Sequence, residues 1–191
     1  MRRFILSAAL IVMSLCFGDV ASAGDFGVLG GANFYSSSVK DINAKNMTQW
    51  HAGALYKVEL PVGFQLQPAL LYNVKGANLN VADANLSVGY LEFMASVQWG
   101  VDLILFRPFV DVSPFVGYGL SGGGKLKNLW KDAANKLEYG VGVGGGLQVW
   151  RFQLAARYNW NFGRLFDAGV EATPFKDANF NGVTLSLAFF F

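Results

Sequence analysis

"LEYGVGVGGGLQVW", residues 137–150, alternates bulky apolar residues with small or polar ones. The bulky side chains share one parity, and Gly140, Gly142, Gly144 and Gly146 share the other. A period of two residues predicts a β-strand with two unlike faces. Alternate glycines weaken a strand and provide no polar cover, so this face is unsuited to water. It suits the crowded interior of a small closed barrel, and the bulky face is then predicted to point outward into lipid.

The same alternation recurs seven more times along the chain. In "FQLQPALLYNVK" the apolar residues keep one parity and the polar residues keep the other: Gln65, Gln67, Asn73 and Lys75. Strands are predicted near residues 25–35, 48–60, 63–75, 86–101, 107–121, 137–150, 152–163 and 181–191. The expected fold is all-β, an eight-stranded antiparallel up-and-down transmembrane β-barrel whose last strand pairs with its first. Pro68 and Pro114 each remove a ladder donor, so a bulge or a locally distorted pairing is expected at each.

The connections between these strands alternate in length. The long polar ones are "SSSVKDINAKN", "GANLNVADAN", "GGGKLKNLWKDAANK" and "RLFDAGVEATPFKDANF". By contrast, "PVG" and the turn at Arg151 are tight, and "DLILFRP" is a longer and unusually apolar turn. Long external loops that alternate with short periplasmic turns are typical of outer-membrane barrels.

The first 23 residues, "MRRFILSAALIVMSLCFGDVASA", have the layout of a secretory signal peptide. Two arginines precede an apolar run that ends at Ala21-Ser22-Ala23, and the run is shorter than the ~20 residues that a membrane-spanning helix needs. The expected division is therefore a cleaved signal peptide, 1–23, and one barrel domain, 24–191. The expected location is the outer membrane of a Gram-negative bacterium.

Charge and cysteine content restrict the possible partners and cofactors. Loss of Arg2, Arg3 and Asp19 with the leader changes the formal charge from +2 to +1, which gives no electrostatic argument for nucleic acid. The only cysteine, Cys16, lies in the leader, and His51 is the only histidine. A transition-metal site is therefore not expected. The glycine runs lack the Gly-Lys-Ser/Thr ending of a phosphate loop, so no cofactor is predicted.

Aromatic residues mark the expected lipid contact. Those near strand ends on the outward parity predict a belt at the lipid headgroups: Trp50, Tyr72, Trp99, Phe152, Trp160, Phe162 and Phe191. The final strand, "VTLSLAFFF", places one outward apolar stripe at the C-terminus: Val183, Leu185, Leu187, Phe189 and Phe191. This stripe resembles the C-terminal signature by which bacterial barrel-assembly machinery recognises its substrates.

Several charged residues have the inward parity: Lys57, Glu59, Glu92, Asp111, Glu138 and Arg157. Buried charges must be paired or hydrogen-bonded, so these residues predict a charge network that plugs the lumen. A narrow solute or ion channel is the alternative if the bore is open. In the connection after residue 121, Lys125, Lys127, Lys131 and Lys136 flank Trp130 and are available to lipopolysaccharide or to an unknown protein partner.

His51 also has the inward parity and raises the alternative of a lipid-modifying hydrolase. Such an enzyme would need a serine and an acid within hydrogen-bond reach of the imidazole, and a site that opens to lipid. No serine lies two or three residues from His51, and contacts between strands cannot be read from one sequence. No catalytic residue is therefore assigned, and a non-enzymatic role is expected.

Four motifs, in this order, resemble the PorT-like outer-membrane β-barrel family of Bacteroidetes: "LQPALLYNVKGANL", "VGYLEFMASVQWG", "RPFVDVSPFVGYGLSGG" and "YGVGVGGGLQVWRFQLAARYNWNFGRL". The resemblance covers most of the chain after the leader and implies the barrel architecture and the outer-membrane location. It implies no particular activity, because the family is broad and most of its members have no assigned activity. Met94 replaces a proline that often follows the "YLE" triplet, and Glu138 replaces a frequent aspartate.

Overall fold

The computed structural model describes residues 24–37, 45–79, 84–123, 137–162 and 180–191. The predicted signal peptide, residues 1–23, lies outside these ranges, as do residues 124–136 with their four lysines. The strands are β1 (Asp25–Ser37), β2 (Lys45–Glu59), β3 (Phe64–Leu79), β4 (Ala84–Gly100), β5 (Arg107–Gly123), β6 (Leu137–Val149), β7 (Phe152–Asn161) and β8 (Phe180–Phe190). A 3₁₀ turn, η1 (Pro61–Gly63), joins β2 to β3. Over these ranges no helix is long and apolar enough to cross a membrane.

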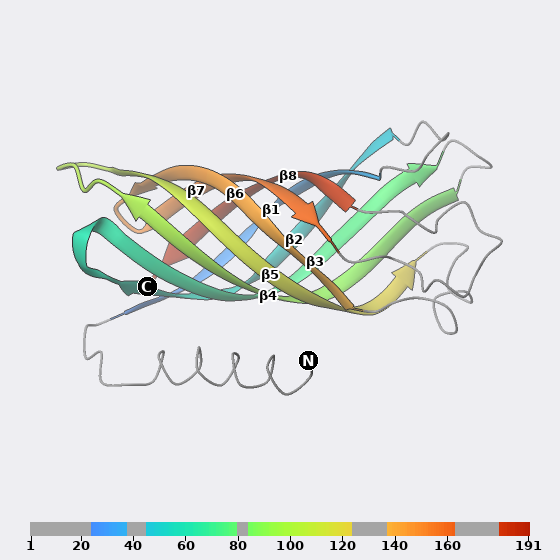
Figure 1. Cartoon of the computed structure of the whole chain (residues 1–191), viewed down its shortest axis with the longest axis horizontal. Coiled ribbons are helices and arrows are strands. Elements are labelled where there is room, and N and C mark those ends of the chain that lie inside the picture. Colours follow the sequence, from blue (N-terminus) through green and yellow to red (C-terminus); the bar gives the residue numbers. More distant parts are fainter. Residues whose placement is uncertain (1–23, 38–44, 80–83, 124–136, 163–179) are drawn as a thin grey trace.

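The strands form one closed antiparallel barrel in chain order (Figure 1). Closure comes from β1 and β8, which pair from Gly27↔Phe190 to Ser37↔Phe180. Because the first and last strands are paired, the sheet has no open edge with unsatisfied backbone groups. The predicted eight-stranded antiparallel barrel is confirmed, and its strand boundaries agree with the prediction within a few residues. The turns after β2, β4 and β6 lie at one end of the barrel, together with the start of β1 and the C-terminus (Figure 1).

The two prolines inside strands interrupt the ladder on one side only. Pro68 is paired regularly with β4 but skipped in the β2–β3 ladder, and Pro114 is paired regularly with β6 but skipped in the β4–β5 ladder. The register is the same before and after each gap. Each proline therefore causes the expected local distortion rather than a bulge, because it lacks the N–H that the ladder needs. The register shifts follow Asn46 in β2–β3 and Gly89 in β4–β5.

The outer surface of the barrel is apolar. Along β7 exposed and buried residues alternate without exception, and the exposed ones include Leu154, Tyr158 and Trp160. Most of the predicted belt residues are exposed: Trp50, Trp99, Phe152, Trp160, Phe162 and Phe191. Tyr72 is partly buried beside the Trp50 ring, with the ring centroids 5.6 Å apart. The outward direction predicted for the bulky face is therefore confirmed.

The C-terminal stripe also lies on the outer surface. Val183, Leu185, Leu187 and Phe191 are exposed, and Phe189 packs against Phe152 with 5.1 Å between ring centroids. Gly182, Thr184, Ser186 and Ala188 are buried on the opposite face of β8. The last strand thus follows the same two-face rule as the rest of the barrel.

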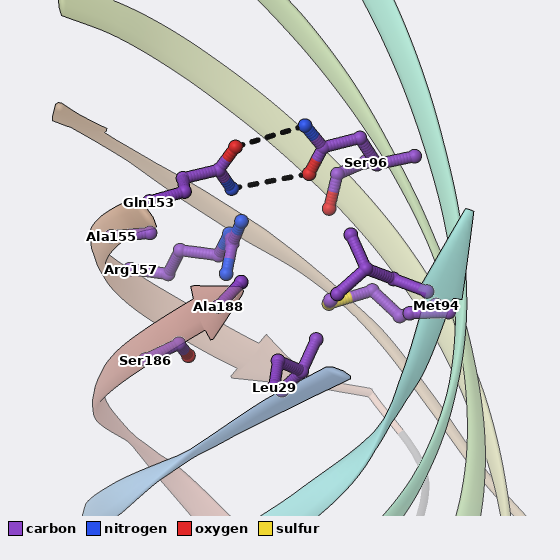
Figure 2. A pocket seen from close by; sticks show the side chains of 11 residues that line it. Leu29, Met94, Ser96, Gln153, Ala155, Arg157, Ser186 and Ala188 are labelled. Atoms are coloured by element: carbon purple, nitrogen blue, oxygen red, sulfur yellow. Dashed lines mark hydrogen bonds between the residues drawn. The ribbon is translucent and has the colours of Figure 1, made fainter. Parts of the chain in front are cut away.

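The interior is filled by side chains from all walls. One apolar cluster of buried side chains lies inside it and contains Leu55, Ala69, Leu71, Met94, Phe115, Ala188 and Phe190. Figure 2 shows the packing at this apolar cluster, where Met94, Arg157 and Ser186 line a cavity of about 10 Å³ and Gln153 exchanges two hydrogen bonds with Gln67. A second cavity of about 20 Å³ lies next to His51. Each has room for about one water molecule.

Candidate functional site: the polar interior

A lysine absent from the predicted charge network is buried in the interior. Lys75 is completely buried, and its Nζ donates to Glu92 Oε2 at 2.9 Å and to Glu138 Oε1 at 2.6 Å. Both carboxylates are themselves buried. We call these three residues the Lys75 cluster. A buried ion pair is tolerated only when its remaining lone pairs and protons are also satisfied.

Neighbouring side chains meet that condition. Asn73 donates to Glu92 Oε2 at 3.0 Å, and Asn161 donates to Glu138 Oε2 at 2.8 Å. Three aromatic rings surround the ammonium group of Lys75, with Nζ-to-centroid distances of 4.5 Å for Phe115, 5.4 Å for Tyr35 and 5.5 Å for Tyr90. Cation–π attraction is strongest when water is excluded, so the rings add to the stabilisation of this charge.

A second buried ion pair joins β5 to β7. Arg157 Nε donates to Asp111 Oδ2, and both side chains are buried. Ser113 Oγ lies 3.3 Å from the same carboxylate oxygen and 2.8 Å from Ser96 Oγ. Its single proton is donated to one of these two oxygens. Among the described residues these two ionic groups account for four of the predicted network positions, namely Glu92, Asp111, Glu138 and Arg157.

The remaining two predicted positions lie at the rim. Lys57 contacts Asp25 at 2.7 Å and Glu59 at 3.4 Å, and its Nζ lies 4.9 Å from the Phe190 ring centroid. The side chains of Asp25 and Glu59 are 42% and 61% exposed. We call these three residues the Lys57 cluster. The assignment of Glu59 to a buried lumen network is therefore wrong: its parity is inward, but β2 ends at this residue and the barrel mouth is open there.

His51 has two partners that come from other strands. Its Nδ1 lies 2.7 Å from Asn33 Oδ1, and its Nε2 lies 2.9 Å from Ser186 Oγ. Asn33 Nδ2 donates to Asn73 Oδ1 and to the Val74 carbonyl, so Asn33 Oδ1 is left as an acceptor. Nδ1 of the neutral imidazole therefore carries the proton, and Nε2 accepts from the serine hydroxyl.

These hydrogen bonds join the histidine to the Lys75 cluster. Asn33 donates to Asn73 at 2.7 Å, and Asn73 in turn donates to Glu92. One continuous set of contacts thus runs from Ser186 through His51 and the two asparagines to the carboxylate. Removing any member leaves a buried polar group without its partner.

Glycines make these contacts between strands possible. Gly31 lies in register with both His51 and Ser186, so the imidazole crosses β1 above it. A Cβ on Gly31 would lie 2.9 Å from His51 Nε2. In the same way Gly144 lies between Asp111 and Arg157.

The Lys75 cluster uses the same arrangement. Gly117 is in register with both Glu92 and Glu138, and a Cβ there would lie 2.8 Å from Glu138 Oε1. Inward glycines on three strands therefore leave the space in which buried polar side chains meet across an intervening strand, and Gly144 is one of the glycines that predicted the barrel.

The short-turn end holds a further polar group, built around Arg107, that was not predicted from the sequence. Arg107 is buried, donates to Gln65 Oε1 at 3.1 Å and to the Gly63 carbonyl at 2.8 Å, and lies 3.3 Å from Asp102 Oδ1. Buried glutamines continue this group inward: Gln65, Gln67, Gln98 and Gln153. Their common inward parity could have predicted that these glutamines are buried. The register between strands, which the sequence does not give, decides which of them meet.

The interior supports little chemistry beyond structure. Ser186, His51 and Asn33 have the connectivity of a nucleophile, a base and an orienting group. All three are buried, and the adjoining cavity has room for about one water molecule, so no substrate reaches the serine in this conformation. Among the described residues no group of three or more histidine, cysteine, aspartate or glutamate side chains is arranged to hold a metal ion.

The distribution of polarity decides the environment of the barrel. Its buried interior carries ions and amides, while its exposed outer face carries large apolar side chains over all strands. Such a surface needs a hydrocarbon solvent, and only closed barrels allow a β-sheet to cross a bilayer. This chain is an outer-membrane β-barrel protein. The location predicted from the sequence is confirmed by this architecture.

Comparison with solved structures supports the fold through neisserial surface protein A, and two further structures match more weakly. Neisserial surface protein A has a TM-score of 0.51 and 13% sequence identity, and the match covers 88% of this chain and 97% of that one. The N-terminal β-barrel domain of Pseudomonas aeruginosa OprF matches with a TM-score of 0.39 and 15% identity, over 88% and 100% of the two chains. Ail, the attachment invasion locus protein of Yersinia pestis, matches with a TM-score of 0.46 and 10% identity, over 88% and 97%.

The sequence comparisons give no family. No protein-family model matches the chain, and no curated protein matches it in sequence. The outer-membrane barrel is therefore the level at which the resemblance is supported, and membership of the PorT-like family stays a prediction.

Proposed function

We propose that this protein is a non-enzymatic outer-membrane barrel with a plugged interior that acts at the cell surface through the long connections between its strands. The closed interior is the observation that carries this proposal. The Lys75 cluster, the Arg157–Asp111 pair and the apolar cluster block the bore, and the two small cavities among the interior side chains measure about 10 and 20 Å³. Neither a solute path nor a substrate pocket fits in that space.

We assign the surface role to the connections for two reasons: the interior is closed, and the connections join the strands at the end of the barrel that faces the cell exterior. They join β1 to β2, β3 to β4, β5 to β6 and β7 to β8, and the strand ends that they join lie opposite the short turns (Figure 1). The β5–β6 and β7–β8 connections are the longest, whereas the strand bounds leave only residues 80–83 between β3 and β4, so the long connection predicted there is wrong. In outer-membrane barrels the longer loops face the exterior of the cell. The name of the neisserial neighbour describes it as a surface protein, which is in line with this proposal.

Planar-bilayer recording tests the plugged interior. The purified barrel is expected to give no conductance above that of the protein-free membrane. A triple variant, Lys75→Ala, Glu92→Ala and Glu138→Ala, removes the central side chains and is expected to give small channels if the barrel still folds. Steady channels from the unchanged protein would contradict the proposal and favour the narrow-channel function.

A lipid-modifying hydrolase is the second candidate, and one observation favours it. Ser186 lies 2.9 Å from the unprotonated nitrogen of His51, which Asn33 orients from the other side. The enzyme would need the barrel wall to open so that an acyl ester reached Ser186. Incubation of the reconstituted protein with lipid A and phospholipid, followed by mass spectrometry, distinguishes the two: deacylated lipid that disappears in Ser186→Ala would support the hydrolase.

A further inference from the structure

The short turns at the periplasmic end expose large apolar side chains at their tips. Val62 in the β2–β3 turn is 83% exposed, and Trp150 in the β6–β7 turn is 76% exposed. In the β4–β5 turn Ile104 is 102% exposed and Leu105 is 78% exposed. Every described short turn thus ends in a residue that water solvates poorly, although turn tips in water are normally polar.

These tips are continuous with the lipid-facing surface. Leu60 and Phe64 flank Val62, and both are exposed on the outer face of the barrel. The same holds for the other turns, where the exposed neighbours are Trp99, Val101, Leu103, Phe106, Val149 and Phe152. The strand portion of this contiguous apolar surface already faces acyl chains. The same hydrocarbon environment therefore suits the turn tips.

Two kinds of charged group lie at this end: the Lys57 cluster and Arg107 lie at the mouth, and Asp102 and Arg151 lie in the turns. Asp102 has an exposed side chain beside the buried Arg107. Arg151 lies over the Trp150 ring, with 5.6 Å from its Cζ to the ring centroid. Tryptophan and arginine are amphipathic, and both place an apolar portion in the membrane while a polar portion reaches the interface.

From this continuity we infer that the three short turns are inserted in the periplasmic leaflet, with Val62, Ile104, Leu105 and Trp150 below the phospholipid headgroups. The turn at residues 101–106 is the largest of these anchors. Its apolar sequence and its length then have a single physical reason, since it extends the lipid-facing surface past the end of β4. The barrel consequently sits low in the membrane, and its short-turn end does not project into the periplasm.

A periplasmic protein is the competing occupant. A hollow of about 380 Å³ lies beside the 101–106 turn, where Gln65, Arg107 and Gln148 provide polar groups. A protein that bound there would also cover Ile104 and Leu105. Measurements on the barrel in lipid alone separate the two, because lipid insertion needs no second protein.

Site-directed spin labelling tests the insertion. Single-cysteine variants at Val62, Ile104 and Leu105, made in a Cys16→Ser background, are labelled and placed in nanodiscs of phosphatidylethanolamine and phosphatidylglycerol. Val112→Cys is the lipid reference because it faces outward in the middle of β5, and Glu59→Cys is the water reference because its side chain opens at the mouth. Collision rates are measured with oxygen, which partitions into lipid, and with a water-soluble nickel chelate.

The expected result is a loss of nickel collisions and a gain of oxygen collisions at all three turn positions, approaching the values at Val112. Turn labels that collide with nickel as often as the Glu59 label, in a folded barrel, would overturn the inference and leave a protein as the occupant. The mobility shift on gels before and after boiling confirms that each variant is folded. Agreement between labels in two separate turns guards against a local effect of any single label.

Discussion

Two lysines of this barrel each contact two carboxylates, but the two clusters differ in exposure. The Lys75 cluster is sealed inside, with both glutamate side chains buried, whereas the Lys57 cluster opens at the rim, with Asp25 and Glu59 partly exposed. Each cluster has the same formal charge. The comparison shows that position along the barrel axis, rather than composition, decides what an ion pair contributes.

The physical reason is the solvent around each group. At the rim the Lys57 side chain is itself buried, but water solvates Asp25 and Glu59 whether or not Lys57 is present, so loss of the cation costs them little. Inside, Glu92 and Glu138 have no water to replace Lys75, and their attraction to the ammonium group is stronger because the surroundings are less polarisable. The two lysines therefore give an internal test of burial with matched chemistry.

The largest effect is expected for Lys75→Met, which keeps the side-chain volume but leaves two buried carboxylates without a cation. The free energy of unfolding is expected to fall by about 3–5 kcal/mol. Denaturant unfolding of the refolded barrel, followed by tryptophan fluorescence and by gel mobility, measures the loss. The triple variant Lys75→Met, Glu92→Gln, Glu138→Gln is the control and is expected to recover most of it. Equal stability of Lys75→Met and the unchanged protein would refute the central role of this cluster.

An intermediate effect is expected for the uncharged contacts of His51. His51→Ala leaves the Asn33 amide oxygen and the Ser186 hydroxyl without their partner, at a cost of about 1–3 kcal/mol for each buried group left unsatisfied. Ser186→Ala removes one hydrogen bond and should cost less. The same unfolding assay checks both variants. Unchanged stability in both, together with a loss of lipid deacylation, would instead identify a catalytic role.

The smallest effect is expected for Lys57→Met at the rim. The loss should be about 0–1 kcal/mol, because the partners of Lys57 remain solvated. It should shrink further in high salt, which screens exposed charges over roughly 10 Å at 0.1 M ionic strength. Unfolding curves at low and high sodium chloride concentration measure this difference. A loss as large as that of Lys75→Met would erase the contrast between the two clusters.

The local pattern of the sequence was sufficient for the fold. Alternation identifies strands, because side chains of neighbouring residues in a strand point to opposite faces. The four glycines of residues 137–150 identified the inner face, since they suit neither water nor lipid. Closure followed from the need to pair every backbone group in a bilayer. Each of these arguments uses residues close together in the chain, which explains why they succeeded.

The candidate site was only partly predictable. Parity correctly placed four residues inside: Glu92, Asp111, Glu138 and Arg157. Parity says nothing about depth along the barrel axis. For that reason Glu59 was assigned to the interior although it lies at the open rim. Lys75 had the same polar parity as its neighbours, yet no partner for it was visible in the sequence. Its two glutamates lie on β4 and β6, and only the register between strands brings them to one ammonium group.

The sequence by itself determined which face of each strand meets lipid, because that choice depends on residues two positions apart. Only the tertiary structure decided that His51 meets Ser186, which is 135 residues away in the chain. The two residues come together because β8 closes onto β1 and because Gly31, between them, has no side chain. Register and closure are properties of the whole sheet, so neither follows from any single stretch of the chain.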